Sequence, residues 1–158
     1  MSDQAIDCDL RKPASREEWA RYHEIRRRSL FDRRLPDVVY DPNHPDERCE
    51  QNHPLALVRD GRVIGTIRID VLDAARVCFR LVAIDESRRG QGFGAHLLRC
   101  AEDYAATRLG RREIVLFAAQ SALGFYLKHG YAPVAPWGET PLDRNSVPIG
   151  KRIGQATD

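Results

Sequence analysis

A glycine-rich segment near the middle of the chain separates two regions that differ in hydrophobic period. Upstream, residues 55–84 contain runs rich in β-branched residues that are divided by turn signals, as in consecutive β-strands. Downstream, apolar residues in 93–105 recur every three to four positions, as in an amphipathic helix. Three glycines at alternate positions, Gly90, Gly92 and Gly94, join the two regions. This order predicts a mixed α/β chain whose backbone can approach a ligand closely at the junction.

The length and composition predict one ordinary globular domain. At 158 residues the chain is expected to form a single domain over 1–158, with 154–158 as a flexible tail. A hydrophobic share of 42% with 30% charged residues argues against disordered and membrane classes, and no apolar run approaches the ~18 residues of a membrane helix. The N-terminus has no apolar signal segment, and the four cysteines form no C-x-x-C pair. We therefore expect a cytoplasmic protein with reduced thiols and no zinc site.

Local patterns predict the order of elements along the chain. Ser15 and Glu18 form a capping box that opens a helix, and Asp60-Gly61 is typical of a two-residue hairpin turn. Residues 35–54 are rich in Pro, Asp, Asn and His, which predicts a long surface loop on the substrate side. Three sequential strands with tight connections predict an antiparallel meander. The expected strands are 5–10, 55–59, 63–71, 77–84, 114–118, 131–134 and 149–153, and the expected helices begin at Ser15, Phe93 and Ser121.

The glycine segment has the features of a phosphate-binding loop. A helix that begins at Phe93 presents unpaired N–H groups and the positive end of its dipole, and the glycines permit close backbone approach. Arg88 and Arg89 beside it can supply charge-assisted bonds to phosphate oxygens, although a glycine turn with solvent-facing arginines is the simpler alternative. Residues 90–95 formally fit the dinucleotide pattern G-x-G-x-x-A. Antiparallel strands precede them, however, and no Gly-Lys-Ser/Thr follows, so a Rossmann site fits poorly and a P-loop is excluded.

Arginines crowd the polar side of the first expected helix. Because glutamates and Asp32 are interspersed with them, we expect a solvated mixed-charge face, with a nucleic-acid surface as the weaker alternative. A formal net charge of +2 is too small for a protein whose whole surface holds nucleic acid. The arginines expected to face solvent are Arg16, Arg21, Arg26, Arg27, Arg28, Arg33 and Arg34.

Two sequence blocks resemble the GNAT superfamily of N-acyltransferases. Residues 82–94, Val-Ala-Ile-Asp-Glu-Ser-Arg-Arg-Gly-Gln-Gly-Phe-Gly, are similar to its acetyl-CoA signature Arg/Gln-x-x-Gly-x-Gly/Ala, which Arg89, Gly92 and Gly94 meet. Residues 122–131 resemble the Phe-Tyr-x-Lys-x-Gly-Phe stretch near the family's C-terminal end. The resemblance implies an α/β (α+β) fold with a mixed, mostly antiparallel sheet of about six to seven strands. About four helices would flank this sheet, and it would be splayed at a CoA-binding cleft.

The resemblance also implies roles for individual residues. The main chain of Val82, Ala83 and Ile84 would pair with the pantetheine arm, and an amide there, such as that of Val82, would polarise the thioester carbonyl. Tyr126 would protonate the departing thiolate; the alternative is a core aromatic on an amphipathic helix. No metal is implied. The backbone amides that would hold the CoA pyrophosphate are those of Arg89, Gly90, Gln91, Gly92, Phe93, Gly94 and Ala95.

The chain departs from the family pattern in three places. Glu86 stands where the family often has Pro, which matters little for binding through the backbone. Ala119 and Gln120 stand where the family often has Asn, which removes one contact to pantetheine. The strand at 77–81 carries no acid that could serve as the general base for the amine, and we assign no base. The remaining candidates, each more simply an ordinary surface residue, are Asp70, Glu24, Glu139 and His53.

These observations predict an acetyl-CoA-dependent N-acetyltransferase. It would transfer an acetyl group to a primary amine of a small molecule or peptide by direct attack in a ternary complex, with acetyl-CoA as cosubstrate and no metal. The alternatives are a CoA-binding, non-catalytic regulatory module, which the missing base favours, and a nucleic-acid-associated protein. Acidic residues in the loop from Asp37 to Glu50, together with Asp70 and Glu139, suggest a cationic acceptor amine. No pattern decides between a monomer and a homodimer.

Overall fold

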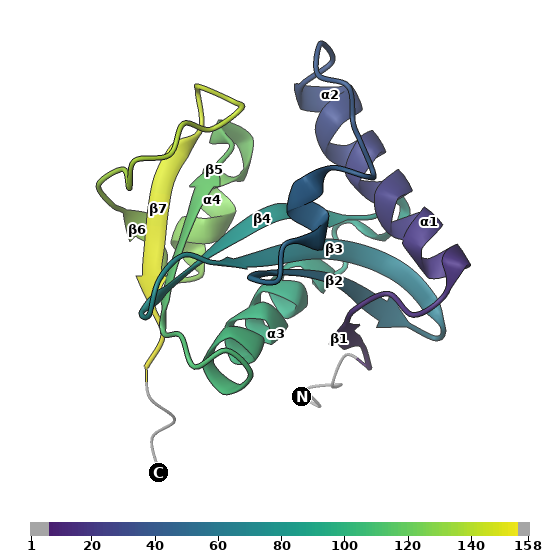
Figure 1. Ribbon diagram of the computed structural model, residues 1–158, viewed down its shortest axis with the longest axis horizontal. Helices are drawn as coiled ribbons and strands as arrows, with labels where there is room; N and C mark the ends of the chain where they lie inside the picture. The colour runs from purple at the N-terminus through teal and green to yellow at the C-terminus, as the bar shows by residue number, and fades with distance from the viewer. Residues whose placement is uncertain (1–6, 155–158) are drawn as a thin grey trace.

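A single seven-stranded sheet runs through the molecule (Figure 1). The computed structural model describes residues 7–154, and its strands follow the order β1-β2-β3-β4-β5-β7-β6. Neighbouring strands are antiparallel except β4 and β5, which are parallel, so the expected mixed, mostly antiparallel sheet is confirmed. The start of the strand predicted at 5–10 and residues 155–158 of the predicted tail lie outside the described residues. The strands are β1 (Asp9–Arg11), β2 (Asn52–Arg59), β3 (Arg62–Val71), β4 (Arg76–Ile84), β5 (Glu113–Ala118), β6 (Ala132–Pro133) and β7 (Val147–Arg152).

Strands β2, β3 and β4 form the predicted antiparallel meander. The turn between β2 and β3 has positive φ at both central residues, 51° at Asp60 and 74° at Gly61, as a tight hairpin turn requires. Side chains of β2 alternate between the two faces of the sheet: Leu55 and Leu57 belong to one buried cluster, and Ala56 belongs to the other. The meander is therefore buried on both faces, which explains why its apolar runs are nearly continuous.

Three helical bodies pack against the sheet, fewer than the four or so that we expected. The first begins with α1 (Arg16–Arg26) and continues without interruption through a π-helical segment, Arg27–Phe31, into the short α2 (Asp32–Arg34). Ser15 caps it as predicted, because its hydroxyl accepts the Glu18 N–H at 3.1 Å. The other two bodies are α3 (Phe93–Thr107) and α4 (Gln120–Lys128).

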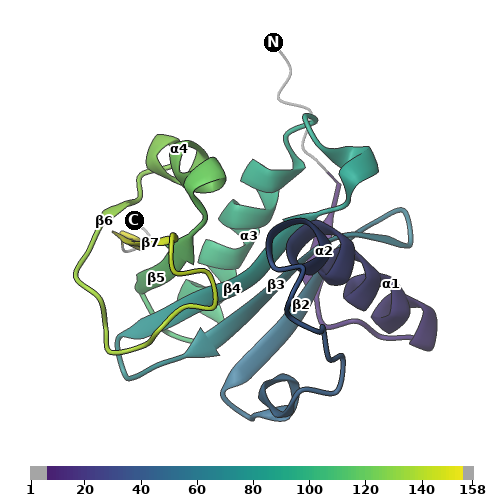
Figure 2. The same ribbon diagram turned by 90° about the horizontal axis from the view of Figure 1, so that it is seen from above.

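The helices lie on opposite faces of the sheet (Figure 2). Tyr22 and Ile25 of α1 pack on one face, in a small cluster with Ala56 and Ala83. The larger core lies on the other face, where α3 and α4 pack. No helix among the described residues is long and apolar enough to cross a membrane. The sheet is thus the middle of three layers, with helices on both of its faces.

The sheet opens between its two parallel strands. β4 and β5 pair only through Arg76 with Glu113, Val77 with Ile114 and Cys78 with Val115. Beyond these pairs β4 continues to residue 84, while β5 continues to residue 118 with β7 as its partner. Consequently, the side of β4 that faces β5 has no strand partner over its second half among the described residues. Backbone N–H and C=O groups on such an edge are available to an extended ligand.

Candidate active-site cleft

A cleft of about 780 Å³ opens where β4 and β5 part, and we name it the β4/β5 cleft. Val82 of β4 and Tyr126 of α4, both singled out by sequence, line it together. The 35–47 segment forms one wall, as expected for a substrate-side loop, and the loop at 139–146 forms another. The 35–54 region is not wholly irregular, however, because it contains a 3-10 turn at Pro45–Arg48 and its last residues already belong to β2.

A backbone irregularity in β4 lies at this opening. Leu81 adopts a positive φ of 54°, which is uncommon for a residue other than glycine. The register with β3 shifts here, because Thr66 faces Ala83 while Arg68 faces Arg80. Two residues of β4 thus oppose one residue of β3, as in a β-bulge, and the Thr66 hydroxyl fixes it by donating to the Leu81 carbonyl at 3.0 Å. The bulge re-aims the backbone immediately before Val82, at the mouth of the opening.

The glycine segment forms the start of α3. Gly90 and Gly92 have φ values of 75° and 85°, in the left-handed region that glycine enters at little cost. Gly92 is the N-cap residue and has no capping side chain, and the first hydrogen bond of the helix runs from the His96 N–H to its carbonyl. The N–H groups of the first turn, including those of Gly94 and Ala95, therefore lack intrahelical partners. This geometry suits a phosphate group.

One of the backbone amides that the resemblance assigns to phosphate binding, that of Arg89, already has a hydrogen-bond acceptor. A 3-10 turn at Glu86–Arg88 precedes the glycines, and within it the Arg89 N–H donates to the Glu86 carbonyl at 3.4 Å, a long bond. The Arg89 side chain is exposed and that of Arg88 is half-buried, and neither forms an ion pair with any described residue. Neither positive charge is neutralised by a neighbouring acid in the described part of the chain, so both are available to an anion.

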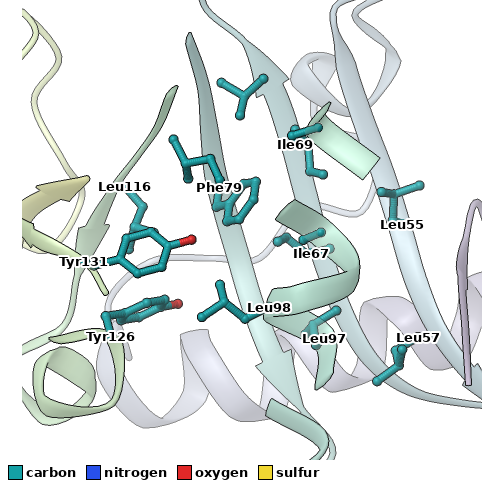
Figure 3. Close-up of a cluster of buried hydrophobic side chains, with 14 of the residues drawn as sticks. Leu55, Leu57, Ile67, Ile69, Phe79, Leu97, Leu98, Leu116, Tyr126 and Tyr131 are labelled. Carbon is teal, nitrogen blue, oxygen red and sulfur yellow. The ribbon is translucent and has the colours of Figure 1, made fainter. Parts of the chain in front are cut away.

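Tyr126 is both a core aromatic residue and a residue of the cleft. It is buried in the main core, with its ring 5.5 Å from that of Tyr131 in an edge-to-face arrangement, and it also lines the β4/β5 cleft. Figure 3 shows the two rings reaching side by side from the α4 side toward Phe79 and Leu98. Burial raises the pKa of Tyr126 to about 12, and Arg34 acts in the opposite direction. The tyrosine is therefore a neutral phenol at physiological pH.

An ion-pair row crosses the floor of the cleft, and the sequence did not reveal it. We name these six residues the ion-pair row; in spatial order they are Arg26, Glu47, Arg68, Asp70, Arg80 and Glu139. Each charge meets an opposite charge on the next residue, with N–O distances of 2.6 Å for Arg26–Glu47, 3.0 Å for Glu47–Arg68, 2.7 Å for Arg68–Asp70 and 2.6 Å for Asp70–Arg80. Buried charges persist only when they are paired in this way.

The row corrects three expectations. Arg26 does not face solvent, since only 1% of it is exposed, and its Nε atom is buried without a partner. Asp70 is not a surface residue either, since it is 5% exposed, and Glu139 is partly buried against Arg80. A hint existed in the sequence, because Arg68 and Asp70 are two positions apart on a strand and so share a face.

The charges of the row leave little free acid on the cleft floor. Burial alone would raise the pKa of Glu47, but Arg26 and Arg68 hold it below its usual value. Among the four candidate bases, Asp70 and Glu139 line the cleft and are held by Arg80. Glu24 does not line it, and His53 lines a smaller cleft of about 620 Å³ beside Trp19, which shares Glu47 and Asn52 with the β4/β5 cleft. No base is assigned by this geometry.

Three further features limit the chemistry of the cleft. Cys78 is the cysteine that lines it, and burial raises the pKa of its thiol to about 12, so it stays protonated and is a poor nucleophile. No group of His, Cys, Asp or Glu in residues 7–154 is arranged to hold a metal ion. The mouth is apolar: Val38, Val39 and Leu142 line it and are among the large hydrophobic side chains that the protein exposes.

Comparison with known proteins agrees with this fold. The model of the acetyltransferase (GNAT) family matches residues 15–131. The solved structure of Escherichia coli ElaA is similar over 94% of this chain and 100% of that protein, with 17% identity and a TM-score of 0.73. A putative N-acetyltransferase from Lactobacillus plantarum matches with 23% identity over 93% and 97% of the two chains and a TM-score of 0.70. An aminoglycoside 6'-N-acetyltransferase complexed with coenzyme A matches with 16% identity over 95% and 99% and a TM-score of 0.72.

Proposed function

The chain belongs to the acetyltransferase (GNAT) family, and on this premise we propose that it transfers an acetyl group from acetyl-CoA to a primary amine of a small molecule or peptide. The observation that carries the proposal is the parting of β4 and β5, which opens a cleft lined by Val82 and Tyr126. The start of α3, whose unpaired N–H groups suit a phosphate, follows β4 in the chain. The described part of the chain would act as one domain, and its four free cysteines suit the reducing cytoplasm.

The residues present fit acetyl-CoA. The N–H groups at the start of α3, from Phe93 to Ala95, would hold the pyrophosphate, with Gly90 to Gly92 giving the backbone close approach and Arg88 and Arg89 supplying positive charge. The free edge of β4 at residues 82–84 would pair with the amide groups of pantetheine as an added strand does. The thioester would then lie at the bulge, between Val82 and Tyr126.

The acetyl transfer needs two contributions from this chain, which are stabilisation of the charge on the carbonyl oxygen and a proton for the departing sulfur. The amine nitrogen attacks the thioester carbonyl and releases one proton to water, since no base is assigned, and the Val82 N–H would stabilise the negative charge that develops on the carbonyl oxygen. When the tetrahedral adduct collapses, the carbon–sulfur bond breaks and the Tyr126 hydroxyl would give its proton to the sulfur. Tyr126 would regain a proton from water after the transfer. Burial raises the pKa of the phenol to about 12, so Tyr126 keeps its proton until the strongly basic thiolate departs.

Gly92 provides a test of the cofactor site. Its φ of 85° disfavours a branched residue, and a Cβ there would meet nothing within 4 Å, so Gly92→Val would disturb the loop backbone without a clash in the core. We expect Gly92→Val to raise KM for acetyl-CoA about tenfold or more. Gly110→Val is the matched control, because Gly110 also has a positive φ and open space but lies beyond the other end of α3. Equal changes in KM for the two variants would contradict the site.

The pH profile of kcat tests the acid. A proton donor works only below its pKa, and that of Tyr126 is raised to about 12. We therefore expect no loss of kcat from Tyr126 below about pH 10, once the amine is deprotonated. A fall in kcat that begins below pH 10 in the wild type and is absent from Tyr126→Phe would contradict this expectation. It would show that the pKa of the Tyr126 phenol is lower than its burial predicts.

Thiol release from acetyl-CoA with a panel of primary amines tests the whole proposal. We expect amine-dependent release with one acetylated amine formed per thiol, together with a rise in Tm on addition of CoA. A CoA-induced rise in Tm without turnover of any amine would instead favour the non-catalytic module. The Gly92→Val variant serves as the reference that should lose both signals at low acetyl-CoA concentration.

A further inference from the structure

Arg80 binds two carboxylates that differ in how firmly they are held. We propose that the acetyl acceptor is an amine that carries a carboxylate group, and that this carboxylate replaces Glu139 on the outer edge of the Arg80 guanidinium. The proposal rests on the function proposed above and narrows its acceptor to amino acids, short peptides and similar compounds.

The position of Arg80 places it at the reaction centre. It precedes the bulged Leu81 on β4 and lines the same cleft as Val82 and Tyr126. The backbones of Arg80 and Val82 are at most about 7 Å apart, and both residues line the cleft, so one small molecule in the cleft can contact both. A carboxylate held there would bring the amine of the same molecule toward the thioester, which gives the reaction its orientation.

The two carboxylates on Arg80 are anchored unequally. Asp70 lies on β3, is nearly fully buried, accepts Arg80 Nε at 2.6 Å and also accepts two bonds from Arg68 at 2.7 and 2.9 Å. Glu139 accepts the two terminal nitrogens of Arg80 in a fork, with 2.5 Å for the second of them, but its side chain is 31% exposed. It lies in the irregular segment at 134–146, which includes Pro136, Gly138 and Pro141. Asp70 is thus a fixed part of the floor, whereas Glu139 is carried by a loop.

A ligand carboxylate can take the place of Glu139 without leaving the Arg80 guanidinium unpaired. The ion-pair row contains three arginines and three acids, so removal of one acid without replacement would leave a guanidinium unpaired beside the cleft. A ligand carboxylate restores the same planar fork, since two parallel N–H···O bonds are the geometry that a guanidinium prefers. A ligand without a carboxylate restores nothing and would leave Glu139 in place.

The charges on the cleft floor fit a binding site for an acceptor with only an ammonium group less well. Glu139 and Glu47 are already neutralised by arginines, so neither presents free negative charge to an ammonium group. Asp41 and Asp46 also line the cleft and are exposed to solvent, and the Asp46 carboxylate lies 3.9 Å from the Arg68 guanidinium. Because Val38, Val39 and Leu142 make the mouth apolar, leucine and phenylalanine derivatives are the probes that fit.

Binding of reaction products gives the cleanest test, since N-acetyl compounds have no amine to titrate. With CoA present, the Kd of N-acetylleucine and N-acetylphenylalanine is compared by calorimetry with the Kd of their amides. We expect the carboxylates to bind at least about tenfold more tightly, because a site built to hydrogen-bond a group rejects the analogue that lacks it. Glu139→Gln should tighten the carboxylates further, because the competing acid is gone; a merely structural role for Glu139 would not give this gain.

The double variant Arg80→Gln/Glu139→Gln removes the fork and keeps the row neutral, which protects the fold. It should bind acids and amides about equally, whereas Arg76→Gln, on the same strand at the exposed Asp73 turn, should keep the preference. No preference in the wild type, no measurable binding of either class, or a preference that survives the double variant overturns the proposal. If leucinamide is acetylated as efficiently as leucine, the acceptor inference fails while the acetyltransferase function stands. If no amine is acetylated, the function itself fails.

Discussion

Replacement of Tyr126 by Phe is expected to lower kcat by about 10²- to 10³-fold, while KM for acetyl-CoA stays nearly constant. The change removes one oxygen from a ring that remains buried among the same neighbours, so packing is preserved. What is lost is the proton for the departing sulfur, and this group acts only in the transition state. A loss confined to kcat is the kinetic sign of such a role.

Tyr131→Phe is the matched control for this prediction. The two rings are in contact, but the Tyr131 hydroxyl donates to Glu102 at 2.8 Å and Tyr131 does not line the β4/β5 cleft. We expect Tyr131→Phe to lose some stability and to keep kcat. Equal activity of Tyr126→Phe and wild type would leave Tyr126 as a core aromatic only, with the thiolate protonated by solvent.

Replacement of Asp70 by Ala is expected to lower the free energy of unfolding by about 3 to 5 kcal/mol. Asp70 accepts hydrogen bonds from both Arg68 and Arg80. Its removal leaves these two neighbouring guanidinium groups without a shared counter-charge in the interior. Urea denaturation with an unchanged m-value measures the effect. This is a large share of the stability of a domain of this size.

Asp32→Ala provides the comparison on the surface. Asp32 pairs with Arg27 at 3.3 Å, and both side chains are more than half exposed. Its loss should cost no more than about 1 kcal/mol. If Asp70→Ala were as mild as Asp32→Ala, the row would not be the buried unit described above, and Asp70 would exchange its partners for water.

Local signals in the sequence predicted most of the elements. The Ser15 cap and the Asp60-Gly61 turn are determined by a few adjacent residues, and both formed as expected. The apolar stripe that begins at Phe93 predicted α3 for the same reason. Element ends were less accurate: β2 begins at Asn52 rather than at Leu55, because its pairing with β3 extends the strand beyond the apolar run.

The features that sequence reasoning missed are those that depend on distant contacts. Glu47 lies 21 positions from both Arg26 and Arg68, and Glu139 lies 59 positions from Arg80, so no local spacing relates them. Arg26 looked like its exposed neighbours because charge alone does not say which side of a helix is buried. The positive φ of Leu81 is also invisible in sequence, since a leucine enters that conformation only when the surrounding strands impose it.

The family resemblance supplied what local reasoning could not. It brought residues 82–84, the glycine segment and Tyr126 into one proposed site. The fold places Val82 and Tyr126 on one cleft, and Gly94 of α3 lies near Ile84 of β4 and Phe125 of α4, although residues 83–95 do not line that cleft. Neither periodicity nor composition connects β4 with α4, which are separated by a helix and a strand. The contacts of these residues with a cosubstrate remain predictions.

A crystal structure with CoA bound tests the central claim most directly, through the place of its thiol. We predict that pantetheine lies between β4 and β5, that the pyrophosphate contacts the N–H groups of residues 93–95, and that the sulfur lies within about 3.5 Å of the Tyr126 hydroxyl. A CoA molecule bound elsewhere, or one whose sulfur is far from both Val82 and Tyr126, would contradict the account.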